Sequence, residues 1–129
     1  MKEIIAFVRR HQVPVSKKAL EEAGFNALTI HSVEGRGKQK GVGGWAAEVD
    51  PQLNSLLKYE TPVEDAVMKW IPKRMLTIAV QDDEVETAVA ALIKANQTGH
   101  IGDGKIFVCP LEDVVRVRTG ENGPRAVGN

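Results

Sequence analysis

The spacing of apolar and polar side chains in the first third of the chain changes from a strand period to a helix period and back. Residues 2–8 and 27–34 are rich in β-branched and apolar side chains, which predicts two strands. Between them, side chains recur at helical spacing through Leu20. Pro14 suits a first helical position and Gly24 ends the run, so the order strand, helix, strand is expected.

The last half repeats this order. Residues 75–80 predict a third strand, and the capping-box pattern Asp83-x-x-Glu86 predicts the start of a helix. Four apolar residues of that helix fall on one face: Val85, Val89, Leu92 and Ile93. Gly99 is placed to cap its end, and residues 105–111 predict a fourth strand.

The C-terminal part predicts a short fifth strand followed by a loose tail. Val115 and Val117 alternate with Arg116 and Arg118, and alternation at a period of two is typical of a half-buried strand. Under this interpretation the valines face inward and both guanidinium groups project from one face.

The predicted order βαβ, loop, βαβ corresponds to an α+β, ferredoxin-like fold in a single domain over residues 1–129, with both helices on one face of an antiparallel sheet. An apolar sheet covered on one side only predicts burial of its other side in an oligomer, because large exposed apolar patches are rare on monomers.

The connection between Gly35 and Pro72 is far longer than the usual 2–6 residues, which predicts a functional or a disordered segment. Two helical starts are visible in it, at Asp50 and at Thr61. Residues 67–75 fit a helix and an extended arm equally well. Leucines and two tryptophans in and beside this loop favour partner binding over a solvated spacer.

Composition excludes several classes of function. Basic and acidic residues both total 17, so no global basic field favours nucleic acid or an anionic membrane surface. The single cysteine, Cys109, argues against disulfides and a structural zinc site, and fits a buried strand position in a reducing, cytoplasmic compartment. The N-terminus has neither a signal peptide nor a membrane span, so no membrane insertion is expected.

The glycine-rich stretch before residue 106 comes close to a phosphate-binding P-loop. Gly99-x-x-x-x-Gly104-Lys105 has the spacing, but Ile106 stands where a magnesium-binding Ser or Thr is needed, and the order helix, loop, strand is the reverse of a P-loop. A glycine turn whose N–H groups form an anion nest, with Lys105 beside it, is one interpretation. A plain turn with a solvated lysine is equally compatible.

Two further basic elements favour an anion site. Paired arginines at Arg116 and Arg118 suit phosphate oxygens, although surface ion pairs to Glu112 or Asp113 are the alternative. The stretch GRGKQKG, residues 35–41, is basic and glycine-rich, and its glutamine offers an oxygen to a phosphate-bound magnesium ion. No nucleophile motif, carboxylate pair or histidine cluster is visible, so binding is favoured over catalysis.

Taken together these motifs resemble the PII family of nitrogen-signalling proteins. The matching residues are Gly35-x-Gly37-x-Gln39-Lys40-Gly41, Ile71-Pro72-Lys73, the run from Thr98 to Val108, and Arg116-x-Arg118-Thr119-Gly120-Glu121. The resemblance implies trimers that bind ATP or ADP in the clefts between subunits. It also names three segments: an extended T-loop (36–71), a B-loop (98–105), and a C-terminal loop and tail (116–129).

The resemblance further implies a set of binding residues. The nucleotide contacts carried over are Thr29, Gly35, Gly37, Lys38, Gly102, Asp103, Gly104, Lys105, Arg116 and Arg118. The 2-oxoglutarate contacts are Gln39, Lys40, Gly41, Lys73 and Gly102, with Gln39 also a ligand of the Mg²⁺ ion that ATP and 2-oxoglutarate share.

The enlarged T-loop resembles the NifI branch of the family, which implies repression of dinitrogenase, relief by 2-oxoglutarate, and a homotrimer or a heteromer with a second NifI-type subunit. A general PII regulator of an ammonium channel or of glutamine synthetase is an alternative with the same nucleotide residues. A small ATP-hydrolysing enzyme would need Asp103 or Glu121 to position water, and a ligand-free structural trimer would have no use for the paired arginines.

Overall fold

The computed structural model describes residues 1–37 and 70–128. The predicted helical starts at Asp50 and Thr61, and the predicted contacts Lys38, Gln39, Lys40 and Gly41, lie outside the described residues. No helix in the described part of the chain is long and apolar enough to cross a membrane.

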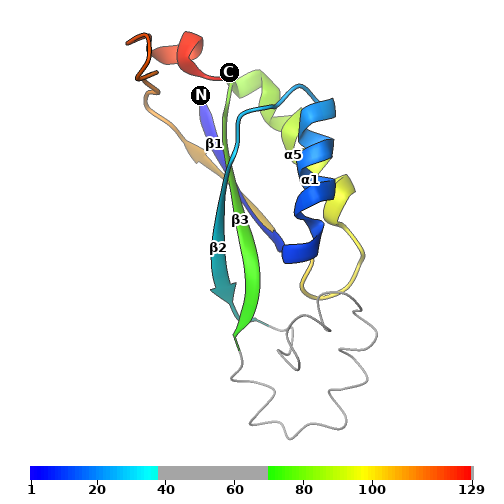
Figure 1. Ribbon diagram of the computed structural model, residues 1–129. Coiled ribbons are helices and arrows are strands. Elements are labelled where there is room, and N and C mark those ends of the chain that lie inside the picture. The colour runs from blue at the N-terminus through cyan, green and yellow to red at the C-terminus, as the bar shows by residue number, and fades with distance from the viewer. Residues whose placement is uncertain (38–69, 129) are drawn as a thin grey trace, which may run out of the picture.

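The described residues form one antiparallel sheet of order β2-β3-β1-β4, with two helices packed on one of its faces (Figure 1). The strands are β1 (Lys2–Arg9), β2 (Thr29–Gly35), β3 (Ile71–Val80) and β4 (Lys105–Pro110), and the helices are α1 (Val13–Glu22) and α5 (Val85–Asn96). Three short 3-10 helices cover Arg10–Gln12, Asp82–Glu84 and Gly123–Ala126. The predicted ferredoxin-like α+β fold is confirmed.

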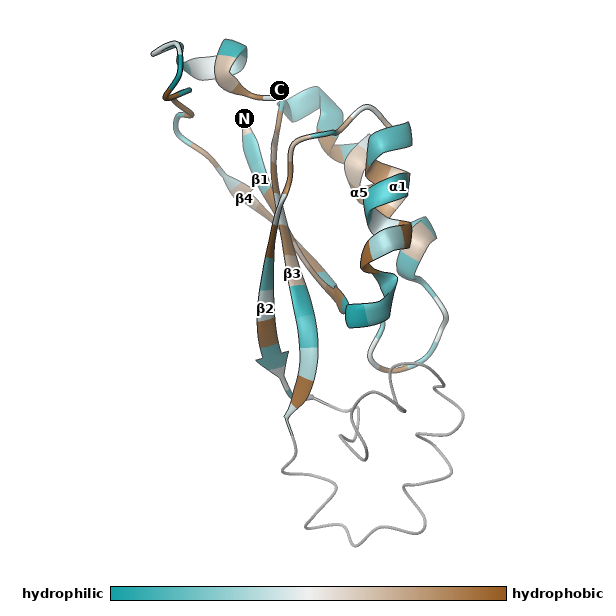
Figure 2. Cartoon of the chain, in the orientation of Figure 1, coloured by the Kyte–Doolittle hydropathy of each residue, from teal (hydrophilic) through white to brown (hydrophobic). Residues whose placement is uncertain are grey.

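The core lies between the sheet and the helices. Alternate residues of β1 and β3 point to it and are buried, including Ile4, Ala6 and Leu76. The helices contribute Leu20 and Leu92, and Figure 2 shows polar colour on the outward side of α1.

The helix period correctly placed Val85, Val89 and Leu92 against the core, but Ile93, predicted on the same face, is 44% exposed. No residue of β2 is buried in the single chain.

The described residues leave the opposite face of the sheet uncovered. Phe7 on β1 and Phe107 on β4 meet there edge to face, with ring centroids 5.9 Å apart, and Phe107 is 47% exposed. Cys109 is only partly buried on the same face, so the prediction that it lies in the core is wrong. Its strand pairs with β1 alone and therefore lies at the sheet edge.

Several element boundaries differ from the predictions. β3 begins at Ile71, so the described part of the undecided arm, residues 70–75, is strand except for Trp70. The capping box is formed by Gln81 and Glu84, whose carboxylate accepts the Gln81 N–H at 2.8 Å, because the chain turns directly after β3. Gly99 lies beyond the end of α5 with φ +85 and belongs to the following loop rather than to the helix cap.

The predicted fifth strand and loose tail are both wrong. Val115 forms one isolated bridge with Asn122, and residues 117–119 form a turn that leaves Val117 99% exposed. The Arg116 N–H donates to the Glu121 carbonyl at 2.8 Å, so this segment pairs with itself instead of joining the sheet. The tail then folds into the last 3-10 helix, which buries Ala126.

Candidate functional site

A cavity of about 680 Å³ lies on the uncovered face, at the end of the sheet where β2 ends and β3 and β4 begin. It gathers six of the predicted contacts from three separate segments: Gly35, Gly37, Lys73, Gly102, Gly104 and Lys105. Phe7, Arg36, Ile71, Ile101 and Phe107 complete its described lining. The T-loop base, the start of β3 and the B-loop therefore meet at one place.

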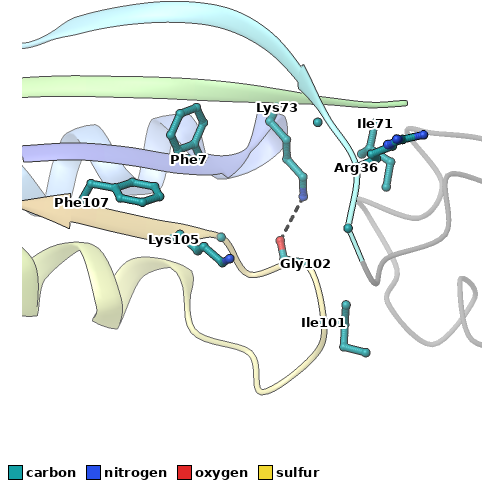
Figure 3. Close-up of a pocket in the computed structure, with 11 residues that line it drawn as sticks. Phe7, Arg36, Ile71, Lys73, Ile101, Gly102, Lys105 and Phe107 are labelled. Atoms are coloured by element: carbon teal, nitrogen blue, oxygen red, sulfur yellow. Dashed lines mark hydrogen bonds between the residues drawn. The ribbon is translucent and has the colours of Figure 1, made fainter. Parts of the chain in front are cut away.

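The charge of this cavity is positive. Arg36, Lys73 and Lys105 contribute cations, and none of the described residues that line the cavity is acidic. Figure 3 shows Lys73 and Lys105 converging beside Gly102, whereas Arg36 extends away from them. The Arg36 guanidinium carbon lies 5.2 Å from the centroid of the Trp70 ring, which holds it by a cation–π contact. Clustered cations with an apolar wall suit an anion that also carries apolar surface.

The B-loop is closed by the carboxylate of Asp103. This group accepts the N–H of Thr98 at 2.7 Å and that of Gly99 at 2.9 Å, and it also accepts the Thr98 hydroxyl. Burial by itself would raise the pKa of Asp103, but the hydrogen bonds from Thr98, Arg9 and Gly99 outweigh it and lower the pKa to about 2. Asp103 is therefore ionised at neutral pH and is engaged within its own loop.

Arg9 anchors this loop to the end of β1. Its side chain is 1% exposed, and its Nη1 donates to Asp103 Oδ1 at 2.6 Å while its Nη2 donates to the Ile101 carbonyl at 3.2 Å. Lys73, the strand partner of Arg9 on β3, donates to the Gly102 carbonyl at 3.0 Å. Two cations on adjacent strands thus hold two consecutive carbonyls of the B-loop.

Gly104 permits the close approach of the loop to the sheet. Its φ is +114, and a Cβ at this position would overlap the carbonyl oxygen of Phe7. A side chain would therefore meet both a disfavoured backbone conformation and a backbone atom that cannot move aside. Gly104 is therefore required by the close approach of the loop to β1, whereas Gly99 has a positive φ but open space around it.

Three other predicted nucleotide contacts lie at the far end of the sheet. Thr29 pairs with Thr77 and Gly35 pairs with Ile71, so six residues of strand, about 20 Å, separate Thr29 from the cavity. Arg116 and Arg118 follow the far end of β4 in the C-terminal segment, which Figure 1 shows at the opposite end of the molecule from the B-loop. One chain does not bring the predicted contacts together.

The arrangement of the arginines also differs from the prediction. They lie in a turn, so the argument from one strand face is wrong. Arg116 forms an ion pair with Glu121 at 3.5 Å and donates to the Arg125 carbonyl at 3.2 Å, instead of pairing with Glu112 or Asp113. The alternation of Val and Arg at residues 115–118 belongs to a turn that pairs with itself. The same alternation occurs in strands, so the spacing of side chains alone does not distinguish the two.

Sequence reasoning missed Arg9, Arg36 and the two phenylalanines. Arg9 ends an apolar strand and precedes another arginine, which resembles a solvated strand end. Phe7 and Phe107 occupy ordinary strand positions, and only the uncovered face reveals them as a cavity wall. The composition of GRGKQKG was the one available signal for Arg36.

Comparison with known proteins supports the predicted family. The model of the family described as "Nitrogen regulatory protein P-II" matches residues 1–121. The chain therefore belongs to the P-II family. The Arabidopsis thaliana PII protein, solved bound to citrate, superposes with a TM-score of 0.72 and 30% identity, covering 99% of this chain and 90% of that one.

Relatives over the full length point to the nitrogen-fixation branch. "Nitrogen fixation nifHD region GlnB-like protein 2" of Methanobacterium ivanovii is 44% identical over 127 residues, which is 98% of this chain and 99% of the relative. A protein of the same name from Methanococcus maripaludis is 45% identical over 128 residues. The predicted resemblance to this branch is confirmed by these relatives.

Proposed function

We propose that the chain is a nitrogen and energy sensor that assembles as a trimer and binds ATP or ADP between neighbouring copies. The observation that carries the proposal is the division of the predicted nucleotide contacts between two ends of the sheet. A cationic cavity with Lys73, Lys105 and the B-loop lies at one end, and Arg116 with Arg118 lies at the other. A head-to-tail ring brings the first end of one copy against the second end of the next.

The uncovered sheet face supports such an assembly. The cavity opens on this face, and Phe7 and Phe107 leave aromatic surface there that a neighbouring copy would cover. Family membership favours a homotrimer. Similarity to the nifHD-region relatives is also compatible with a heteromer that contains a second NifI-type subunit. In this assembly each subunit would be one domain of residues 1–129, with its T-loop at residues 36–71.

The chemistry of the cavity fits the proposed effectors. Triphosphate oxygens suit Lys105 and the B-loop amides, and a distal carboxylate of 2-oxoglutarate suits Lys73. We assign Mg²⁺ to Gln39, with Lys40 and Gly41 beside 2-oxoglutarate. When bound, the ion would supply positive charge that offsets the negative charge of phosphate and carboxylate groups. We further place the protein in the cytoplasm, where these metabolites are present.

The output of the sensor is proposed to be the T-loop, acting on dinitrogenase. The names of the nifHD-region relatives associate such proteins with nitrogen fixation, and the long loop begins and ends beside the effector cavity at Gly37 and Ile71. Effectors that bind one loop state better than another would shift the loop between a docking and a released state.

Calorimetry tests the effector assignment. ATP with magnesium should bind the wild-type protein and permit 2-oxoglutarate binding, and Gln39→Ala should lose the second event while ATP alone still binds. Undiminished 2-oxoglutarate binding by Gln39→Ala would show that the assignment of the metal ligand is wrong.

Capture from nitrogen-starved and ammonium-fed lysates tests the partner. Deletion of residues 45–66 should abolish capture of dinitrogenase and leave ATP binding intact. Capture of an ammonium channel or of glutamine synthetase instead would favour the general PII regulator.

The ATP-hydrolysing alternative is disfavoured by the two candidate carboxylates. Asp103, with its pKa lowered to about 2 by the hydrogen bonds that overcome burial, is a weak base engaged by Arg9 and Thr98. Glu121 is paired with Arg116. Steady ATP turnover by the purified protein would revive this alternative, and a thermal stability that does not respond to ATP would favour the ligand-free structural trimer.

A further inference from the structure

The B-loop is held from the inside by a buried arginine, Arg9. Arg9 is 1% exposed and uses its two terminal nitrogens on two different acceptors, the Asp103 carboxylate and the Ile101 carbonyl. Neither acceptor is close in sequence, since both lie more than ninety positions away. The fork of a guanidinium is suited to two acceptors at fixed angles, which an ammonium cannot match.

The bond to the Ile101 carbonyl has a consequence for the next amide. A peptide unit is planar and trans, so its C=O and the following N–H point in opposite directions. Because the Ile101 carbonyl is drawn toward buried Arg9, the Gly102 N–H is directed away from the interior. Gly102 lines the cavity, and its own carbonyl is held by Lys73 at 3.0 Å (Figure 3).

The bond to Asp103 fixes the remainder of the loop. Through Asp103, Arg9 is connected to the N–H groups of Thr98 and Gly99, which are the first residues after the C-cap of α5. The ion pair therefore joins the end of β1 to both ends of the B-loop. A B-loop with fewer such hydrogen bonds would be more mobile before binding. It would lose more conformational entropy when a ligand binds, and its affinity would be lower.

We propose that Arg9 is a positioning residue of the effector site, which orients the Gly102 N–H so that it donates to an oxyanion, a phosphate or carboxylate oxygen, in the cavity. This inference rests on the proposed function of the cavity. It assigns Arg9 no contact with the ligand, since its side chain is buried behind the loop.

The test uses Arg9→Lys in the full-length protein, with Arg10→Lys as the matched control. Arg10 is the adjacent arginine and is exposed. Lysine keeps the charge for Asp103 and cannot also hold the Ile101 carbonyl. We expect the dissociation constant for ATP to rise about tenfold in Arg9→Lys, because the charge-assisted hydrogen bond from the Gly102 N–H to the ligand is lost. The dissociation constant should stay unchanged in Arg10→Lys.

Two further measurements separate positioning from stability. Titration with inorganic phosphate should weaken in proportion to ATP if the oxyanion contact is affected, and the amide exchange rate of Gly102 should rise about tenfold without ligand. A role in stability alone would lower the melting temperature and leave ATP and phosphate affinity unchanged. If Arg9→Lys does not fold, Asp103→Asn, which keeps the side-chain shape, is expected to show the same loss of affinity.

The outcomes distinguish this inference from the proposed function. If wild type binds neither ATP nor phosphate, the proposed function fails, and unchanged Gly102 exchange in Arg9→Lys overturns the inference as well. If wild type binds ATP and Arg9→Lys binds it equally well, the inference alone is overturned.

Discussion

The two ends of the sheet hold their predicted anion contacts in different ways. At the B-loop end, backbone groups are fixed by the ion pair of Arg9 and Asp103, whose side chains are 1% and 23% exposed. At the far end, Arg116 and Glu121 form an ion pair at 3.5 Å, and their side chains are 22% and 40% exposed. The backbone groups of the B-loop end are therefore held in place without a ligand, whereas the Arg116 side chain at the far end can change its partner more easily.

The energetic difference follows from burial. Breaking a fully buried ion pair by removing one partner costs about 3–5 kcal/mol, and a fully exposed pair contributes about 0–1 kcal/mol. The Arg9–Asp103 pair lies nearer the first limit and the Arg116–Glu121 pair nearer the second. Glu121 can therefore be exchanged for a ligand oxyanion at little cost. A rigid half in one copy and an adaptable half in the next would together enclose a nucleotide.

Mixing subunits should give the largest effect. Lys73→Ala with Lys105→Ala disables the B-loop end, and Arg116→Ala with Arg118→Ala disables the far end. The far-end variant alone should bind ATP on the order of a hundredfold more weakly, because two charge-assisted contacts to the nucleotide are lost. The B-loop variant alone should bind ATP at least about tenfold more weakly, because Lys105 is assigned to the triphosphate and Lys73 to 2-oxoglutarate. Co-refolded at equal amounts, they should regain tight binding at about a quarter of the clefts, since random trimers place two intact ends together that often.

Calorimetric stoichiometry measures the recovered clefts, and wild type mixed with either variant serves as the control. Recovery of no tight sites in a mixture shown by mass spectrometry to contain mixed trimers would place each site within one chain.

Substitution of two glycines should give the next largest effect. Gly104→Ala should lower the free energy of unfolding by about 3 kcal/mol or more, because left-handed strain adds to overlap with the Phe7 carbonyl. Gly120→Ala, with φ +74 and no atom within 4 Å of the added Cβ, should cost about 1 kcal/mol. Urea unfolding measures both, and equal costs would contradict the close approach assigned to Gly104.

The acid dependence of stability should distinguish the rigid end. The pKa of Asp103 is about 2 when folded, below the ordinary value of 3.8, despite burial that would raise it. Its contribution is therefore present in full above about pH 4 and is lost as pH falls toward 2. The difference in unfolding free energy between wild type and Asp103→Asn should shrink over that window. Glu121→Gln is the control, and a difference independent of pH would contradict this assignment.

The contact between Arg36 and Trp70 should give the smallest effect. Both residues adjoin the last β2–β3 pair, and their cation–π contact should contribute about 0.5–1 kcal/mol. A double-mutant cycle of Arg36→Ala and Trp70→Leu, measured by urea unfolding, isolates this pair from the other contacts of Arg36. A coupling energy near zero would mean that the base of the T-loop is held by other groups.

The success of sequence reasoning depended on how local each feature was. The strands, both helices and the Gly24 stop follow from periodicities of a few residues, and the P-II family follows from short motifs such as Thr98 to Val108. The false fifth strand had the same local period as a true one. Its self-pairing from Val115 to Asn122 depends on a turn that the alternation of Val and Arg conceals.

The sequence by itself determined the order of elements, most of the side chains that enter the core, and the family, because each depends on neighbouring residues. Only the tertiary structure decided that Arg9 is buried against Asp103, ninety-four positions away, and that Asp103 faces its own loop. The tertiary structure also decided that Lys105, at the start of β4, and Arg116, beyond the end of β4, lie at opposite ends of the sheet. Burial and pairing between distant segments are set by how the strands align in space, and no local pattern of side chains encodes that alignment.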